Sequence, residues 1–162
     1  MAYYTGAVSR GGNQFTTGIV ALAAGVAVGD TLTMSNLVPG DSFTARLQIN
    51  ATGSSLDLRY AMTTTTTGSA TLASTLQLTV RTKTTNPCSS QDGTILYGPG
   101  NLSSAAIGNP SGGQQPGDRT LLGGGNEDLC FTVKLPSTAP LSVQGTNTGA
   151  TFSFKAEQVP NT

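Results

Sequence analysis

Apolar and polar residues alternate with a period of two in five segments of this chain, and this pattern restricts the fold more than any other feature. The segments are residues 41–50, 56–62, 76–83, 127–135 and 152–157. Successive side chains of a β-strand point to opposite faces, so each segment is expected to form a strand with one apolar face. Two sheets packed through their apolar faces bury all of these stripes, which predicts an all-β, two-sheet sandwich.

The composition also favours strands and turns over helices. The chain has 162 residues, of which 26 are Thr and 21 are Gly. Thr packs well in strands, whereas Gly marks turns and bulges. Two further strands are expected near residues 17–23 and 30–36, and Pro39 followed by Gly40 predicts a turn.

Two stretches lack a clear period. Residues 63–75 are low in sequence complexity, and a loop, a short helix through residues 70–74 and an O-glycosylated patch are all open readings. Residues 98–126 are rich in Gly, Pro, Asn and Ser and are longer than most loops of compact domains. We expect this insertion to be functional, disordered or pinned by other parts of the molecule.

Charge is sparse and balanced, with eight basic residues, eight acidic residues and no His. A balanced chain has no electrostatic footprint for nucleic acid or for an anionic membrane surface, so we expect neither as a partner. No stretch reaches the ~20 consecutive apolar residues that a membrane span needs, so no span is expected.

The residue types that carry most enzymatic chemistry are scarce. The absence of His excludes a Ser-His-Asp triad, a Cys-His pair and a His metal site, and two Cys are too few for a thiolate zinc cluster. Carboxylates that a calcium ion accepts occur at Asp118, Glu127 and Asp128 and at Asp30 and Asp41, but their spacing is more typical of solvated turns. We therefore expect no catalytic residue, no cofactor and no metal site.

The two cysteines, Cys88 and Cys130, are expected to form a disulfide. Cys88 lies in a polar stretch where a buried thiol would be unusual, and Cys130 is expected to point away from the apolar face of its strand. Such a bridge would staple the two ends of the 98–126 region. The alternative is a pair of buried free thiols in a cytosolic protein.

Two N-glycosylation sequons begin at Asn50 and Asn101. Sequons also arise by chance in a Thr-rich chain, so both residues are candidates only. The meaning of these sites depends on the organism.

The first sixteen residues differ from the remainder of the chain. Residues 2–8 have strand character, and residues 9–13 then resemble a flexible joint. We divide the chain into an N-terminal strand and joint at 1–12 and a sandwich domain at 13–162. We expect a secreted protein whose signal peptide has been removed.

The order of several motifs resembles the TasA/camelysin family of secreted proteins. The motifs are GNQFTTGIVAL at 12–22, MSNLVPGDSF at 34–43, GSSLDLRY at 53–60, DLCFTV at 128–133 and ATFSFKAEQ at 150–158. Together they span nearly the whole chain. The cysteine pair and the 98–126 region look like additions to the family pattern, and no HExxH motif supports the protease activity described for camelysin.

The resemblance implies a jelly-roll sandwich with a protruding N-terminal donor strand that completes a sheet of the next subunit. The expected product is a head-to-tail homopolymer, such as a biofilm-matrix fibre or a pilus-like filament, outside the cell or at its surface. Other matrix components are candidate partners. The donor residues implied are Ala2, Tyr3, Tyr4, Thr5, Gly6, Ala7 and Val8, with Tyr3, Tyr4 and Val8 as anchors and Gly11 and Gly12 as the joint.

Other readings remain open at this point. The chain is alternatively a monomeric secreted module that binds glycan or protein through residues 63–75 and 98–126. A hydrolase and a viral jelly-roll capsid protein are more distant alternatives. The N-terminal strand itself either reaches a neighbouring subunit or folds back on its own sheet.

Overall fold

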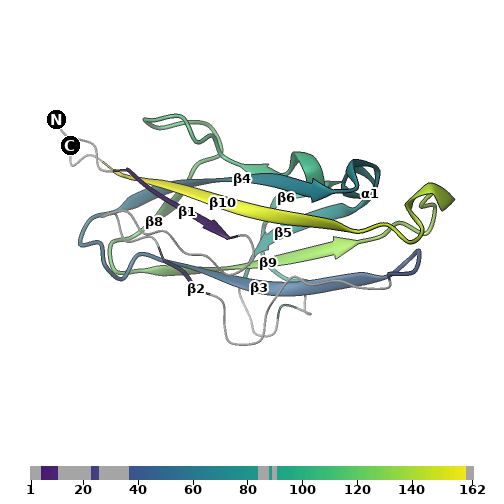
Figure 1. The fold of residues 1–162 in the computed structure, drawn as a ribbon. Helices are drawn as coiled ribbons and strands as arrows, with labels where there is room; N and C mark the ends of the chain where they lie inside the picture. Colours follow the sequence, from purple (N-terminus) through teal and green to yellow (C-terminus); the bar gives the residue numbers. More distant parts are fainter. Residues whose placement is uncertain (1–4, 11–22, 26–36, 84–87, 89–90, 160–162) are drawn as a thin grey trace.

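The computed structural model describes residues 5–10, 23–25, 37–83, 88 and 91–159, with side chains described for all of these except 5–10 and 23–25. Two antiparallel sheets pack face to face (Figure 1). Sheet A contains β1 (Thr5–Arg10), β10 (Thr148–Gln158), β4 (Leu58–Gly68), β7 (Ala106–Ile107) and β8 (Arg119–Leu121). Sheet B contains β2 (Ala23–Gly25), β3 (Ser42–Asn50), β9 (Asn126–Lys134), β5 (Gln77–Thr82) and β6 (Ile95–Asn101). The predicted all-β sandwich is confirmed.

The chain crosses repeatedly between the two sheets. The strand order is β1-β10-β4-β7 in sheet A, where β8 also pairs with β4, and β2-β3-β9-β5-β6 in sheet B. β3 is followed in the sequence by β4, and β9 is followed by β10. In each pair the two strands lie in opposite sheets. This double Greek-key connectivity is the jelly-roll arrangement.

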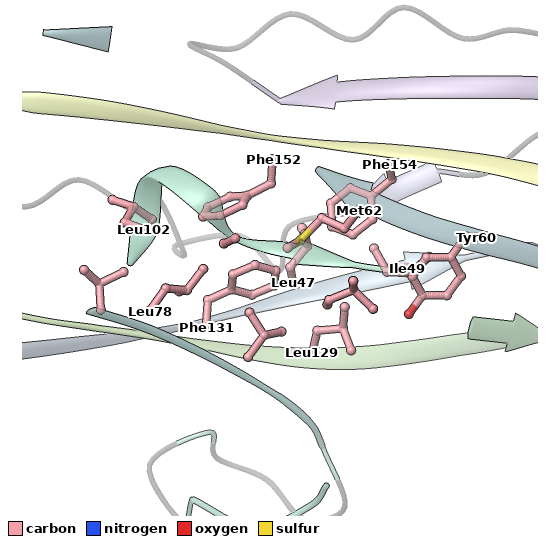
Figure 2. Close-up of a cluster of buried hydrophobic side chains, with 14 of the residues drawn as sticks. Leu47, Ile49, Tyr60, Met62, Leu78, Leu102, Leu129, Phe131, Phe152 and Phe154 are labelled. Atoms are coloured by element: carbon pink, nitrogen blue, oxygen red, sulfur yellow. The ribbon is translucent and has the colours of Figure 1, made fainter. Parts of the chain in front are cut away.

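The inward faces of both sheets form one hydrophobic core, as Figure 2 shows. The largest fully buried side chains are Tyr60, Phe131, Phe154, Ile49, Leu58, Met62, Leu76, Leu78, Leu129 and Val80. Aromatic rings meet across the two layers, because the Phe131 ring of β9 lies with its centroid 4.8 Å from that of Phe152 in β10. The alternating stripes of the sequence are therefore the core, as expected from the period of two.

Several strand bounds differ from those expected. Residues 63–68, the first part of the low-complexity stretch, continue β4. They form a strand because β10 pairs with β4 as far as Gly68. A short helix, α1 (Ala70–Thr75), follows and is capped by Ser69, whose Oγ accepts a hydrogen bond from the Leu72 amide at 3.2 Å. Of the three readings of residues 63–75, the helix is therefore present. The strands expected at 17–23 and 30–36 lie outside the described residues, apart from Ala23.

The long insertion is pinned to the sandwich rather than extended from it. After β6, a short 3-10 helix η2 (Leu102–Ser104) leads into β7, and both β7 and β8 pair with β4. Between them, residues 109–118 cross the outer face of sheet A and are called the strap below. The Gly-rich segment is therefore held on the sandwich by the pairing of β7 and β8 with β4 and by the strap.

The disulfide between Cys88 and Cys130 is confirmed, with the two Cα atoms 5.6 Å apart. Cys130 alternates with the buried Leu129 and Phe131 and so lies on the outer face of sheet B, as predicted. The bridge attaches the β5–β6 connection to β9, and Gln91 adds a hydrogen bond from its Nε2 to Thr132 Oγ1 at 3.3 Å. The disulfide thus braces an outer face and, as predicted, joins the two chain segments that flank the 98–126 region.

The described part of the N-terminal segment does not protrude. Residues 5–10 form β1, which pairs with β10 of the same chain. This differs from the protruding strand expected from the resemblance. The physical reason is that an unpaired edge of β10 is a template for strand addition, and the nearest available strand is tethered to the same chain.

Removal of the disulfide is expected to lower the free energy of unfolding. The double variant Cys88→Ser/Cys130→Ser is expected to lose about 2–4 kcal/mol, because the bridge closes a loop with a sequence separation of 42. Urea denaturation measures this loss. Reductant is expected to reproduce the shift in the unmodified chain and to leave the double variant unchanged. An unfolding midpoint that is insensitive to reductant would contradict the expectation.

Candidate assembly site

The candidate site is the edge of sheet A, where β1 lies against β10. Six residue pairs are in antiparallel register, from Thr5 opposite Glu157 to Arg10 opposite Phe152. β1 is the last strand of the sheet, so its other edge has no partner strand among the described residues. Figure 1 shows β1 in purple beside the yellow β10. Main-chain hydrogen bonds along one edge therefore attach this strand to the sandwich.

Only some of the predicted donor residues fall in the described part of the chain. Thr5, Gly6, Ala7 and Val8 lie in β1, whereas Ala2, Tyr3 and Tyr4 and the joint residues Gly11 and Gly12 lie outside the described residues. The strand also continues through Ser9 and Arg10, which the sequence assigned to the joint. The donor assignment and the division at residue 12 stay predictions.

The described core side chains come from strands β3 to β10 and their connections. Among the residues whose side chains are described (37–83, 88 and 91–159), the buried hydrophobic ones lie between Ala45 and Ala156. On β10 itself, the inward-facing Phe152 and Phe154 and the buried Ala156 pack against the core from their own strand. β10 is therefore held by contacts with the remainder of the molecule, and β1 pairs with it in antiparallel register.

β10 is longer than β1, which pairs with one of its edges. β10 pairs with β4 along all eleven residues from Thr148 to Gln158, whereas β1 covers only residues 152–157. Residues 148–151 have no partner on the β1 side among the described residues. The edge of β10 thus extends past the end of β1, toward the start of β10.

A buried ion pair on the outer face of sheet A holds β10 in place. Arg59 of β4 and Glu157 of β10 are register partners, and Arg59 Nε lies 2.8 Å from Glu157 Oε1. Both residues are buried. Their contact is ionic rather than a well-aligned hydrogen bond, because neither atom meets hydrogen-bond geometry. Removing one residue of such a pair would leave the other charge buried without a counter-charge, so the pair holds β10 to β4.

The strap covers this ion pair and binds β10 directly. Glu157 Oε2 accepts a hydrogen bond from the Gly113 amide at 3.1 Å, and Lys155 Nζ donates one to the Pro110 carbonyl at 2.7 Å. Asp118 closes the strap by accepting from the Asn109 and Gln115 amides, each at 2.9 Å. The sequence analysis did not predict these contacts, because no local pattern shows which strand residues 109–118 cross.

A second polar cluster links the two sheets near the same end of β4, through the residue that follows Arg59. The Tyr60 hydroxyl donates to Glu127 Oε2 at 2.5 Å, and Arg119 forms an ion pair with the same carboxylate. Burial raises the pKa of Tyr60, and the negative charge of Glu127 raises it further. The hydrogen bond with Glu127 raises the pKa of Arg119. This cluster joins β4 and β8 to β9 and is a structural lock.

The remaining acidic candidates each have a local structural partner. Asp128 accepts from Gln48 Nε2 at 3.0 Å and pairs with Arg46, and Asp41 accepts from the Val38 amide at 3.1 Å. Asp30 lies outside the described residues. Within the described part of the chain, no group of three His, Cys, Asp or Glu side chains is placed to share a metal ion.

The two sequons differ in their surroundings. Asn50 Oδ1 accepts a hydrogen bond from the Thr52 amide at 2.8 Å. Asn101 is exposed at the end of β6, and its carbonyl accepts from the Tyr97 hydroxyl at 2.8 Å. Glycosylation at either residue stays a prediction.

No protein-family model matches the sequence, and no curated protein matches it either. In the described ranges, none of the helices has the length and apolar character that crossing a membrane requires.

Alkaline pH is expected to destabilise the chain through Tyr60. Its pKa is raised in the folded state above the unfolded value of about 10, so its contribution is complete below pH ~10 and is lost as the pH rises further. Each pH unit in that window is expected to remove about 1.4 kcal/mol. Urea midpoints of the unmodified chain and of Tyr60→Phe, compared on both sides of pH ~10, measure this difference. Parallel pH profiles would rule out the proposed coupling.

Proposed function

We propose that this chain is a structural subunit of an extracellular protein filament, polymerising head to tail by donor-strand complementation. The observation that carries the proposal is β1, a six-residue edge strand at the start of the chain that is attached to β10 through backbone pairing. A strand of this kind can leave its own sheet and occupy the same position in the next copy. Exchange of an identical element between copies is a low-cost route to assembly.

The energetics of exchange support this proposal. The register along β10 and its main-chain hydrogen bonds are the same whether β1 comes from the same chain or from another copy. The Arg59–Glu157 pair and the strap hold β10 through contacts with β4 and with residues 109–118. We expect these contacts to keep the edge of β10 in place when β1 leaves. Because each copy donates one strand and accepts one, the contact is heterologous and gives a filament when the rotation does not close.

Three further features favour a secreted structural role over catalysis. A disulfide is typical of oxidising, extracellular compartments. The motif order resembles the TasA/camelysin family, whose members form matrix filaments. The chain also has no His, and in the part that the structure describes the carboxylates of Asp41, Asp118, Glu127, Asp128 and Glu157 each have a structural partner. We propose that the partners are copies of the chain itself, together with other matrix components.

Deletion of residues 1–12 is expected to abolish filaments. Purified full-length and truncated proteins, incubated over a range of pH, salt and concentration, are compared by negative-stain electron microscopy. The full chain is expected to form filaments and the truncated chain to remain as particles, because the truncated chain has an acceptor edge but no donor. Monomers from both proteins under all conditions would contradict the proposal and favour a monomeric binding module.

A covalent lock tests strand exchange without shortening the chain. Ser9 lies opposite Ser153, and directly opposed Cα atoms in antiparallel strands are about 4.5–5.5 Å apart, within reach of a disulfide. The variant Ser9→Cys/Ser153→Cys, oxidised as a monomer, is expected not to polymerise. Oxidation after assembly is expected to give a ladder of covalent multimers instead.

The single variants Ser9→Cys and Ser153→Cys are the matched controls for the lock. Each is expected to polymerise normally and to give no ladder. Filaments that grow equally well from the locked monomer would show that β1 does not exchange, even if the truncated chain fails for reasons of folding.

A further inference from the structure

Each end of the sandwich presents an exposed large apolar side chain. The Leu141 end comprises residues 37–40 and 135–147, and the Leu122 end comprises residues 51–57 and 122–125. Leu141 is 87% exposed and Val38 is 59% exposed at the first end, and Leu122 is 67% exposed at the second. A single exposed apolar side chain is ordinary on a protein surface, so the case for these ends rests on their charge and on the path of the chain.

The two ends lie at opposite poles of the molecule. β3 runs from Ser42 at the Leu141 end to Asn50 at the Leu122 end, and β9 runs back between the same ends. Both strands have nine residues, which places the two ends about 30 Å apart. Figure 1 shows the loops of the two ends on opposite sides of the sandwich.

Hydrogen bonds hold both sets of loops in place. At the Leu141 end, the 3-10 helix η3 (Leu141–Val143) presents Leu141, and the Gln144 amide donates to the Leu141 carbonyl at 3.0 Å. At the Leu122 end, the Gly125 amide donates to the Leu122 carbonyl at 2.8 Å, and Asp57 accepts from the Gly123 amide at 3.0 Å. The exposure of both leucines is therefore set by the fold.

Charge is nearly absent from both ends. Residues 37–40 and 135–147 contain no Asp, Glu, Lys or Arg, and Asp57 is the single charged residue of 51–57 and 122–125. Asp57 already accepts the Gly123 amide. Depletion of charge is typical of the buried centre of a protein interface, so neither end presents a charge that would oppose its burial against the other, apart from the bonded Asp57.

The path of the chain determines which ends meet when β1 is exchanged. β1 runs antiparallel to β10 and ends at Arg10, opposite Phe152, so it points toward the Leu141 end of the copy that accepts it. β2 begins at Ala23 opposite Asn50, at the Leu122 end of the donor's own body. The connecting residues must therefore run from the Leu141 end of the acceptor to the Leu122 end of the donor.

The length of the connection allows this arrangement. Residues 11–22 supply twelve residues, which span about 40 Å at most. β10 continues past Phe152 for four residues, which corresponds to about 13 Å of strand before the Leu141 end is reached. The rest of the connection is enough to enter a donor body seated directly on that end.

We infer that the Leu122 end of each donor subunit packs against the Leu141 end of its acceptor. This inference rests on the proposed strand exchange and names the second surface that a subunit uses. The occupant of each apolar end is thus another copy of this chain. The contact removes Leu122, Leu141 and Val38 from water together, which a partner bound at only one end would not do.

Cysteine cross-linking tests this contact on filaments of the full chain. The variant Leu122→Cys/Leu141→Cys is oxidised after assembly and run on a non-reducing gel. A ladder of multimers is expected, because each copy offers one thiol to each neighbour. The single variants are expected to run as monomers on the gel, because each copy then carries only one of the two thiols. Dimers from Leu141→Cys alone would indicate a Leu141–Leu141 contact and would overturn the inference.

A matched control uses an exposed apolar residue away from both ends. Ile95, on the edge strand β6, is 44% exposed. The variant Ile95→Cys/Leu141→Cys is expected to give no ladder. Likewise, Leu141→Ser is expected to raise the critical concentration for filament formation about tenfold, whereas Ile95→Ser is expected to leave it unchanged.

The outcomes separate the two proposals. Filaments that require residues 1–12 but give no Leu122–Leu141 ladder, and that tolerate Leu141→Ser, would overturn the end-to-end contact and leave strand exchange standing. An absence of filaments from the unmodified chain would overturn the proposed function, and the end-to-end contact with it.

Discussion

Main-chain pairing along β10 is the constraint on which the rest of this structure depends. β10 is paired with β4 over its full length and with β1 over residues 152–157, and its inward side chains Phe152 and Phe154 anchor the core of sheet A. The unpaired side of such a strand is a template for the addition of another strand, so β10 is fixed on its β4 side and open to pairing on the other. The fold fixes the β4 side and fills the other side with the start of the chain.

The outer faces of the two sheets are braced by different chemistry. On sheet A, the Arg59–Glu157 pair links β10 to β4, and the strap binds β10. On sheet B, the Cys88–Cys130 bridge holds the β5–β6 connection against β9. Both braces act on strands that the core also holds, since Glu157 and Lys155 lie on β10 and Cys130 lies on β9. The arrangement separates the stable body of the subunit from the part proposed to move.

The sequence predicted the features that depend on local alternation and missed those that depend on register. The stripes through Leu47, Phe131 and Phe154 identified the core, and the same alternation placed Cys130 on an outer face. β6 was missed, because Gly98 and Pro99 suggest a loop, although Pro is tolerated in an edge strand. The Arg59–Glu157 pair depends on the pairing of two strands that are far apart in sequence, and no pattern within either strand reveals it.

The balance between the closed subunit and the filament follows from the two proposals together. The β1–β10 hydrogen bonds are the same in both forms, so they favour neither. A tethered β1 competes at an effective concentration in the millimolar range, which strongly favours the closed form in dilute solution. Polymerisation therefore needs a contact that only the filament makes. Packing of the Leu122 end on the Leu141 end supplies such a contact, because its apolar side chains stay in water as long as β1 remains in its own sheet.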